Sequence, residues 1–497
     1  MKITIENKSI LDSTADLIVV NLFEGVKTPS GATGAVDKAF KNVISKFIIK
    51  QEKFSAKLGE IMVVTVPDNK TFKRIAVIGL GKSKEFNLDK VRTLGIKLYR
   101  KLKVLKNVKK IGTILHGAGI AGLDPELCAQ MFSEGLLSAS YEYNKYKTKP
   151  QEPKFSELVF CETDKKHFTA AKKGIKTAQI LAEAQNSARD LINEPAMFVT
   201  PQKVAEIAKS IKGVKTTVYN KAQAKKMGMN AFLAVGEGSV NPPEFIHMKY
   251  TPAKGKPKRK IAFIGKGITF DSGGLDLKPA ASMLTMKDDM SGAASILSLM
   301  KAVVELQPNL EIHGIIAACE NMPSGSSYKP GDVLTAKNGK TIEVDNTDAE
   351  GRITLADALC YAEELKVDEI IDMATLTGAC VVALGTFVSG VMGNNQKLID
   401  KVIECAYQSG EKFWQLPMFE EYGKVLESDI ADMKNTGSRY GGASSAGVFL
   451  NNFVKSTPWC HIDIAGTAYL DKAGADGIKG PTGVGIKTLI NYVRSYK

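Results

Sequence analysis

The sequence predicts an α/β protein with two domains, a smaller one at the N-terminus and a larger one at the C-terminus. Short apolar runs rich in β-branched residues alternate with stretches of helical periodicity, which is typical of sheets covered by helices. A chain of 497 residues exceeds the length at which a single hydrophobic core keeps growing. Hydrophobic residues make up 44% of the chain and charged residues 24%, as in an ordinary globular protein.

The predicted N-terminal α/β domain covers residues 1–165. Strands are expected in five apolar runs bounded by turn residues, at 17–22, 61–66, 74–79, 111–115 and 157–160. Helical periodicity predicts helices at 35–49, 88–105 and 125–142. The segment GLGKS at 79–83 is similar to a phosphate loop, but Ala76 and Lys84 stand where the P-loop and dinucleotide patterns require glycine. We interpret it as a tight turn after a strand.

A connecting helix is predicted between the two domains. Residues 167–192 are rich in alanine and carry apolar residues at helical spacing, and Asn193-Glu194-Pro195 ends the pattern. We therefore assign 166–194 to a connecting helix and 195–497 to the C-terminal domain, after a basic surface loop at 144–154.

The C-terminal domain is expected to contain a central mixed sheet flanked by helices on both faces. Its strand candidates are 216–219, 245–250, 260–264, 311–319, 369–374 and 460–464, and its helix candidates are 202–211, 291–306, 355–366, 396–408 and 482–494.

The formal net charge of +14 raises the question of nucleic-acid binding. The lysines are spread through the chain, with denser patches at 101–110, 144–154 and 254–260. None of these patches is interleaved with aromatic residues as a surface for single strands would be. We therefore expect these lysines to be solvated surface residues and not a nucleic-acid-binding site.

Location is predicted from hydropathy and cysteine usage. The chain has no apolar run of about 18 residues, so no membrane helix is expected. The segment MKITIENKSI lacks the apolar core of a signal peptide. The seven cysteines are scattered, never form C-x-x-C and mostly lie in apolar runs, which indicates buried thiols in a reducing cytoplasm.

The stretch TIEVDNTDAEGRITLAD, at 341–357, carries the strongest chemical signal. Asp348 and Glu350 lie two residues apart, so in an extended segment their side chains would point the same way. Two carboxylates that close destabilise each other unless a cation lies between them, which predicts a site for a hard divalent ion. The alternative is an acidic surface turn. Gly351 follows the acids and can take backbone angles closed to other residues.

A second stretch upstream, at 261–292, strengthens the metal interpretation. The apolar strand-like run 261–264 ends in Gly265-Lys266-Gly267, and Asp271, Lys278 and the pair Asp288-Asp289 follow. Open α/β sheets place their sites at such strand ends, so we expect the two stretches to meet. Spacing alone leaves open whether Asp288 or Asp289 is the ligand.

The sequence lacks the residues that other hydrolytic mechanisms require. The five histidines lie outside the acidic stretches and no H-E-x-x-H is present, which excludes a thermolysin-like zinc helix. Ser272 has no G-x-S-x-G elbow and no histidine in these stretches to act as its base. A two-metal phosphoesterase would normally bring histidine ligands. The remaining hypothesis is metal-assisted hydrolysis, with carboxylates as the metal ligands.

The blocks GKGITFDSGGLDLKP, MKDDMSGAA and NTDAEGRITLADAL resemble those of the leucyl aminopeptidase family, the two-metal cytosol aminopeptidases. The resemblance covers the whole second half of the chain, including NEPAMFVTP at 193–201 and WCHIDIAGTAY at 459–469. The third block departs from the usual signature only at Ile353, where leucine is commoner.

The resemblance implies a set of site residues. Two divalent ions, Mn²⁺ or Zn²⁺ with Co²⁺ or Mg²⁺ as alternatives, would be held by Lys266, Asp271, Asp289, Asp348 and Glu350. Lys278 would stabilise the oxyanion, and Arg352 would bind a bicarbonate ion that acts as general base. The substrate pocket would be lined by Met286, Thr375, Gly378, Ala465 and Ala468, although Met286 or Ala465 could equally belong to the core. Ala468 stands where a bulkier methionine is often found, so the pocket would be roomier.

The implied function is a cytoplasmic leucyl aminopeptidase that assembles as a homohexamer through its N-terminal domain. It would hydrolyse the N-terminal bond of peptides with a free α-amine, preferring leucine and other apolar residues, with a hydroxide activated by the two metals. A protein that keeps the fold but binds nucleic acid instead stays open as an alternative, because some members of the resembled family act on DNA.

Overall fold

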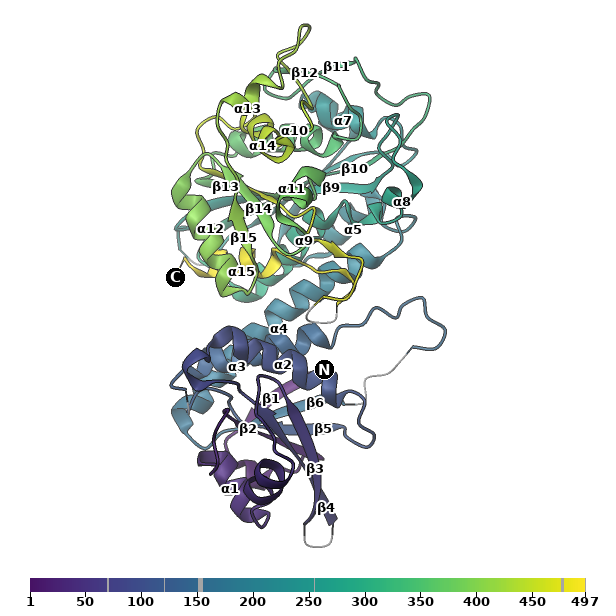
Figure 1. Cartoon of the computed structure of the whole chain (residues 1–497). Coiled ribbons are helices and arrows are strands. Elements are labelled where there is room, and N and C mark those ends of the chain that lie inside the picture. Colours follow the sequence, from purple (N-terminus) through teal and green to yellow (C-terminus); the bar gives the residue numbers. More distant parts are fainter. Residues whose placement is uncertain (69–70, 120, 151–154, 254, 475–477, 497) are drawn as a thin grey trace. The chain divides into compact units, whose positions relative to one another are not determined.

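Figure 1 shows a computed structural model of the chain, which describes residues 1–68, 71–119, 121–150, 155–253, 255–474 and 478–496. The chain divides into two compact units. The first comprises Met1–Glu183 and Ala473–Ile478, and the second comprises Ala184–Lys472 and Lys479–Lys497. Each unit is a sheet covered by helices, which confirms the predicted two-domain α/β class.

The first unit contains a six-stranded sheet of order β1-β6-β5-β2-β4-β3. These strands are β1 (Lys2–Glu6), β2 (Leu17–Leu22), β3 (Ile61–Asp68), β4 (Thr71–Gly79), β5 (Lys110–Thr113) and β6 (Glu157–Cys161). All neighbours are parallel except β3 and β4. All five predicted strands are present. The prediction missed β1, whose sequence KITIE alternates apolar residues with charged and polar ones at the edge of the sheet.

The predicted helices 88–105 and 125–142 are present as α2 (Leu88–Leu102) and α3 (Pro125–Ala139). Their backbones approach closely where glycines face the partner helix. A β-carbon on Gly135 would lie 2.0 Å from the carbonyl oxygen of Arg92. The single helix expected at 35–49 is wrong. The chain forms α1 (Gly31–Ala39) and a separate π-helix η2 (Val43–Gln51), because Lys41 and Asn42 adopt φ angles of 55° and 62°, which end the first helix.

The predicted connecting helix is present as α4 (Lys165–Asn193). The division between the two units falls inside α4, between Glu183 and Ala184. The three-part division at 165 and 194, with a role for each part, stays a prediction.

The second unit contains the predicted mixed sheet, with eight strands in the order β15-β14-β17-β13-β9-β10-β8-β7. They are β7 (Lys215–Asn220), β8 (Glu244–Tyr250), β9 (Lys260–Asp271), β10 (Glu311–Asn321), β13 (Glu369–Ala374), β14 (Ser389–Gly393), β15 (Phe413–Gln415) and β17 (Trp459–Asp463). The neighbours β17, β13, β9 and β10 run parallel, and so do β14 and β15. The pairs β14–β17, β10–β8 and β8–β7 are antiparallel.

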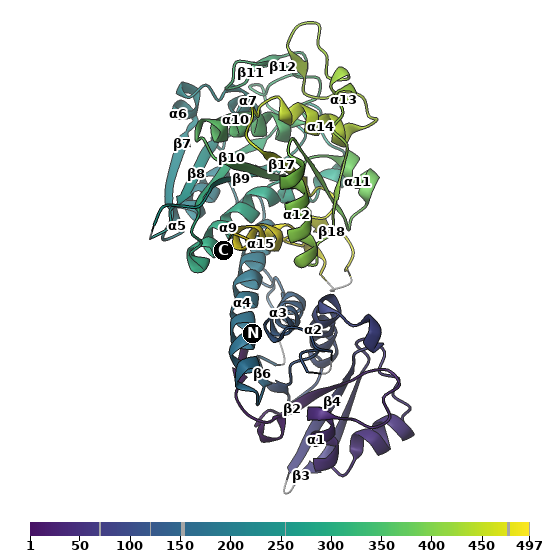
Figure 2. The same ribbon diagram turned by 90° about the vertical axis from the view of Figure 1, so that its left-hand side faces the viewer.

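Helices cover both faces of this sheet (Figure 2). One face carries α5 (Pro201–Ser210), α9 (Ser291–Leu306), α12 (Gln396–Gln408) and α15 (Ile486–Arg494), and the other carries α7 (Asn230–Gly236), α10 (Glu350–Glu364) and α14 (Gly442–Asn451). The strands between these layers are accordingly buried along most of their length.

Strand β9 is longer than predicted. The apolar run was expected to end before Gly265, yet the strand continues through Lys266 to Asp271. Helix α9 lies against this segment, and a β-carbon on Gly292 would lie 2.7 Å from the Lys266 amide nitrogen. The glycines therefore let a helix approach the strand and do not end it.

A small sheet lies beside the eight-stranded one and supports the loop before α10. It consists of β11 (Val333–Thr335), β12 (Thr341–Glu343) and β16 (Met433–Lys434), with β12 parallel to β16.

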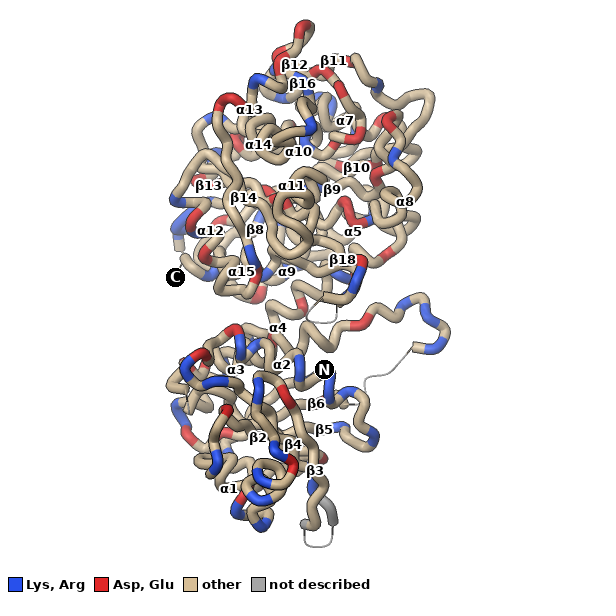
Figure 3. Tube along the Cα trace, in the orientation of Figure 1, with Lys and Arg blue, Asp and Glu red and all other residues tan. Residues whose placement is uncertain are grey.

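Three further sequence predictions concern the surface and the thiols. All seven cysteines are buried and unpaired, as expected. No helix among the described residues has the length and hydropathy needed to cross a membrane. Lys and Arg are interspersed with Asp and Glu along both units (Figure 3). Of the predicted lysine patches, residues 151–154 and 254 lie outside the described residues.

Candidate active site

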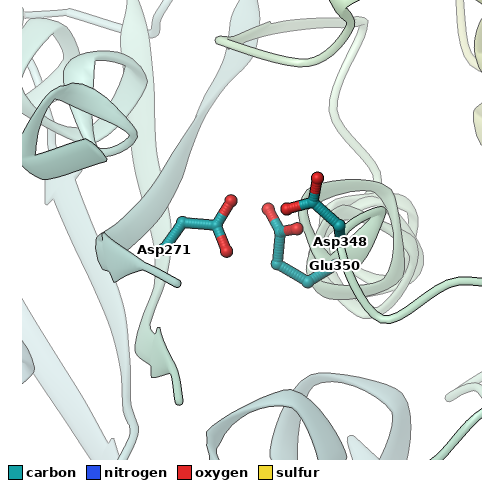
Figure 4. A group of neighbouring side chains, drawn as sticks. All are labelled: Asp271, Asp348 and Glu350. Carbon is teal, nitrogen blue, oxygen red and sulfur yellow. The ribbon is translucent and has the colours of Figure 1, made fainter. Parts of the chain in front are cut away.

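Three carboxylates from two distant stretches meet beside the mixed sheet (Figure 4). Asp271 is the last residue of β9, Asp348 lies in the turn after β12, and Glu350 is the first residue of α10. One ligand atom from each lies within 4.8 Å of the others, as a shared cation would require. The two acidic stretches therefore meet, as the strand-end argument predicted.

The geometry that brings Asp348 and Glu350 together differs from the extended segment we expected. The Asp348 amide donates to the Asn346 side-chain oxygen at 2.7 Å in a turn, and α10 begins at Glu350. The predicted helix at 355–366 therefore begins five residues earlier, because the acidic segment itself forms its first turn.

Lys266 links this cluster to Asp289. Its ammonium nitrogen lies 2.8 Å from Asp289 Oδ1 and 2.8 Å from Glu350 Oε1, and it donates to the Thr375 carbonyl oxygen at 2.9 Å. The Thr375 hydroxyl also donates to Asp289 Oδ1 at 2.8 Å. Of the pair that the sequence left open, Asp289 is thus the member in contact with Lys266.

Gly351 provides space for Lys266. It lies inside α10 and does not adopt the positive φ that glycine alone readily allows. A β-carbon at this position would lie 2.4 Å from Cε of Lys266 and 2.6 Å from Nζ.

Lys278 pairs with the other two carboxylates. Its ammonium lies 2.9 Å from Asp271 Oδ2 and also contacts Asp348 Oδ1. The loop between β9 and Lys278 turns sharply at Gly273 and Gly274, whose φ angles of +90° and +70° favour glycine.

Burial sets the electrostatics of the cluster. Burial raises the pKa of Asp289 and of Glu350, and neighbouring carboxylates add to this effect. Burial disfavours the charged form of Lys266, but the carboxylates of Asp289 and Glu350 outweigh it and raise the pKa of the ammonium. Each lysine therefore acts as the counter-cation of two carboxylates.

The donor set fits hard divalent ions. Asp289 Oδ2 and Glu350 Oε2 are buried and have no hydrogen-bond partner among the described residues, so each can coordinate an ion without losing a protein contact. Carboxylate oxygens are ligands that such ions prefer.

Arg352 lies two residues beyond Glu350 in α10 and is largely buried. Its Nη1 donates to the carbonyl oxygen of Asn435 at 2.8 Å, and its Nε is buried without a partner in the described part of the chain. Burial lowers the pKa of its guanidinium to about 10, which leaves it charged at neutral pH.

The predicted pocket residues lie in loops and short helices at the ends of the central strands. Met286 begins the short helix η4 (Met286–Asp288), and Thr375 follows β13 in direct contact with Asp289. Gly378 begins α11 (Gly378–Leu384) and is exposed. Ala465 and Ala468 follow β17, where Ala465 is half-buried and Ala468 is buried.

Sequence reasoning missed several buried polar residues around the carboxylates. Asn321 donates from Nδ2 to Asp271 Oδ1 at 2.9 Å and to the Thr347 carbonyl oxygen at 3.0 Å. The Tyr328 hydroxyl donates to the same carbonyl oxygen at 2.7 Å. Asn321 ends β10, so the strand-end argument could have found it. No local pattern points to Asn435.

A sheet with helices on both faces and a cluster of carboxylates and lysines at its strand ends is typical of a metal-dependent hydrolase. The family model "Cytosol aminopeptidase family, catalytic domain" matches residues 186–490, and the model for the family's N-terminal domain matches residues 19–150. The chain therefore belongs to the cytosol aminopeptidase family, and it is a metal-dependent aminopeptidase.

Relatives match over nearly the full chain. A probable cytosol aminopeptidase of Persephonella marina is 45% identical and covers 92% of both chains. One from Sulfurihydrogenibium sp. is 42% identical over 99% of this chain and 98% of its own.

Two solved structures are also similar to this chain over nearly its full length. A mutant of tomato leucine aminopeptidase has a TM-score of 0.86 at 34% identity, covering 99% of this chain and 96% of that one. The bottromycin maturation enzyme BotP in complex with Mn has a TM-score of 0.85 at 30% identity, covering 97% of this chain and 99% of that one.

Proposed function

We propose that the protein is a leucyl aminopeptidase that releases leucine and other apolar residues from the N-termini of peptides with a free α-amine. The single observation that carries this proposal is the cluster of the buried Asp271, Asp289 and Glu350 with the half-buried Asp348 around the ammonium groups of Lys266 and Lys278. The similarity to tomato leucine aminopeptidase supports the choice of leucine.

Two divalent ions would be held by Lys266, Asp271, Asp289, Asp348 and Glu350. When bound, they would supply Lewis acidity and lower the pKa of a water molecule toward neutrality. We propose Mn²⁺ or Zn²⁺, with Co²⁺ or Mg²⁺ as alternatives, and the BotP complex with Mn supports the first choice. Lys266 must be neutral to coordinate an ion, and the added positive charge of the ions favours that form.

Lys278 is assigned to the oxyanion of the tetrahedral intermediate. Its ammonium lies at the edge of the cluster, beside Asp271 and Asp348, and is less deeply buried than that of Lys266. A donor placed at a developing negative charge contributes about 3–4 kcal/mol in comparable sites.

Arg352 is assigned to a bicarbonate ion that would accept a proton as general base. The buried guanidinium supports an anion site, because its Nε has no partner among the described residues while Nη1 is fixed by Asn435. A planar guanidinium is also suited to bind a planar oxyanion through two donors.

Substrate selection is assigned to Met286, Thr375, Gly378, Ala465 and Ala468. Thr375 supports this placement because it contacts Asp289 directly and so lies beside the proposed reacting groups. A small residue at Ala468 would leave room for branched or aromatic side chains.

The protein is further proposed to be cytoplasmic and to assemble as a homohexamer. Residues 1–165 would serve assembly, 166–194 would connect, and 195–497 would carry catalysis. The seven buried, unpaired thiols support a reducing compartment.

The test is hydrolysis of leucine p-nitroanilide by the purified full chain. It is run beside its N-acetylated form and beside the alanine, lysine and glutamate anilides. The proposal expects turnover of the free leucine compound, no turnover of the acetylated one and lower kcat/KM for the charged residues. Equal turnover of the acetylated compound would contradict the requirement for a free amine. A preference for lysine or glutamate would contradict the apolar pocket.

A further inference from the structure

The loop 345–349, which carries Asp348 and leads into Glu350, has no regular secondary structure of its own. Its backbone groups must therefore be satisfied by other parts of the chain. Much of this is done by the side chain of Asn435, which is fully buried and lies about ninety positions later in the sequence.

Both the oxygen and the nitrogen of the Asn435 side-chain amide form hydrogen bonds with the backbone of the loop. Its Oδ1 accepts from the amides of Asp345 at 2.8 Å and Asn346 at 3.3 Å. Its Nδ2 donates to the carbonyl oxygens of Asn346 at 2.7 Å and Ala349 at 3.4 Å. A carboxylate in the same place would lack the donors, and an apolar side chain would leave these loop groups buried and unpaired.

The backbone of Asn435 is fixed at the same time. Its amide donates to the Glu343 carbonyl oxygen at 3.0 Å, which continues the pairing of β16 with β12. Its own carbonyl oxygen accepts from Nη1 of Arg352 at 2.8 Å. One buried residue thus connects the loop that carries Asp348 with the guanidinium in the first turns of α10.

We propose that Asn435 is a positioning residue, which holds Asp348 and Glu350 in the arrangement that binds the ions and sets the direction of the Arg352 guanidinium. This inference rests on the proposed function, because it assumes that these carboxylates coordinate metal. Groups that orient metal ligands typically contribute 10- to 100-fold to metal affinity or activity.

The test compares Asn435→Ala and Asn435→Asp with a matched control, Thr436→Val. The Thr436 hydroxyl donates to the Asp345 side chain at 2.6 Å, so the control also removes one hydrogen bond to the loop but none to its backbone. The full-length variants are stripped with chelator, their folding is checked by circular dichroism, and Mn²⁺ affinity is measured by competition with a chromogenic chelator. Turnover of leucine p-nitroanilide is measured in parallel.

Both Asn435 variants are expected to bind Mn²⁺ about 10- to 100-fold more weakly and to lose kcat by a similar factor, whereas Thr436→Val stays within about threefold of the unmodified chain. The aspartate variant should be the weaker of the two Asn435 variants, since its carboxylate would face two carbonyl oxygens. Folded variants with unchanged Mn²⁺ affinity and kcat would overturn the inference. If the unmodified chain itself bound no Mn²⁺ and showed no turnover, the proposed function would fail instead.

Amide hydrogen exchange on the unmodified chain gives a test that needs no variant. If Asn435 organises the loop before any ion binds, the amides of Asp345 and Asn346 should be protected in the chelator-treated protein. Protection that arises only after Mn²⁺ is added would overturn the inference, because the ions and not Asn435 would then order the loop.

Discussion

Gly351 and Lys266 are so close that the glycine leaves space for the lysine. A β-carbon at position 351 would lie 2.4 Å from Cε of Lys266, and the ammonium beyond it lies 2.8 Å from both Asp289 and Glu350. The sequence places this glycine next to Glu350, so the same turn of α10 supplies one carboxylate and the space for its partner.

Replacing Gly351 with alanine should separate activity from stability. Alanine is the better helix former by about 1 kcal/mol, so α10 should not be weakened by the change itself. The added methyl group would displace the buried Lys266 side chain, and we expect kcat to fall at least tenfold. Measurements of kcat and of the thermal midpoint check this. Gly423→Ala is the control, since a β-carbon there makes only an ordinary contact of 3.5 Å with Val448. Wild-type kcat in the Gly351 variant would contradict this account.

Lys278→Ala should lower kcat far more than it changes KM. A donor that acts on the oxyanion contributes mainly in the transition state, and its loss should cost about 100- to 1,000-fold in kcat. Steady-state kinetics with leucine p-nitroanilide measure both constants. Lys203→Ala, which removes an exposed lysine paired with Glu206, serves as the control. An unchanged kcat in Lys278→Ala would remove the proposed oxyanion role.

Ala468→Met should narrow the substrate pocket. Ala468 is buried, so a longer side chain must extend into neighbouring space. We expect kcat/KM for the leucine anilide to fall about tenfold relative to the alanine anilide, which is the scale of discrimination by pocket volume. The readout is the ratio of kcat/KM for the leucine anilide to kcat/KM for the alanine anilide. A thermal melt shows whether the variant is folded. A ratio equal to that of the unmodified chain would place Ala468 outside the pocket.

His116 should make the N-terminal unit sensitive to acid. It is buried between Asn21 and Thr113, with ring nitrogens 3.0 Å from each side chain, and burial lowers its pKa to about 3. An unfolded histidine has a pKa of about 6.5, so below that pH the unfolded state binds the proton and the folded state does not. The stabilisation by neutral His116 is therefore complete above pH 6.5 and falls by about 2 kcal/mol at pH 5.

Hydrogen-exchange protection of β5 and β2 at pH 7.5 and pH 5, corrected for intrinsic exchange rates, measures this loss. His116→Gln removes the titrating group and should show a smaller difference between the two pH values. His167→Gln, at a half-buried position, should retain the full difference. Equal pH dependence in His116→Gln and the unmodified chain would contradict the assignment.

Much of the fold could be predicted because its core strands are mostly apolar runs. Strands such as β2 and β10 are buried throughout or nearly so, and their sequences are correspondingly apolar. Strand β14, with the sequence SGVMG, and β15, with three residues, lack that signal, because pairing with neighbours and not local composition places them in the sheet. The break between α1 and η2 depends on two left-handed residues that periodicity does not reveal.

In the candidate site, too, some residues could be predicted from local sequence and others could not. The acidic and lysine residues lie in two short motifs, so the sequence could propose them together. Their supports come from elsewhere in the chain: Asn321 from the end of β10 and Asn435 after β16. The position of Asn321 at a strand end could have indicated it, whereas Asn435 is defined by tertiary contacts alone and no local pattern in the sequence points to it. The space that Gly351 leaves for Lys266 is also a tertiary feature, since the glycine lies in α10 and the lysine in β9.

The most direct test of the central claim is metal-dependent turnover of leucine p-nitroanilide. The purified chain is stripped with chelator and assayed before and after Mn²⁺, Zn²⁺, Co²⁺ or Mg²⁺ is restored, beside Glu350→Ala and Asp271→Ala checked for folding. We expect chelator to abolish turnover, at least one ion to restore it, and neither folded variant to recover with any ion. Full turnover in the stripped protein, or recovery in either variant, would contradict the central claim.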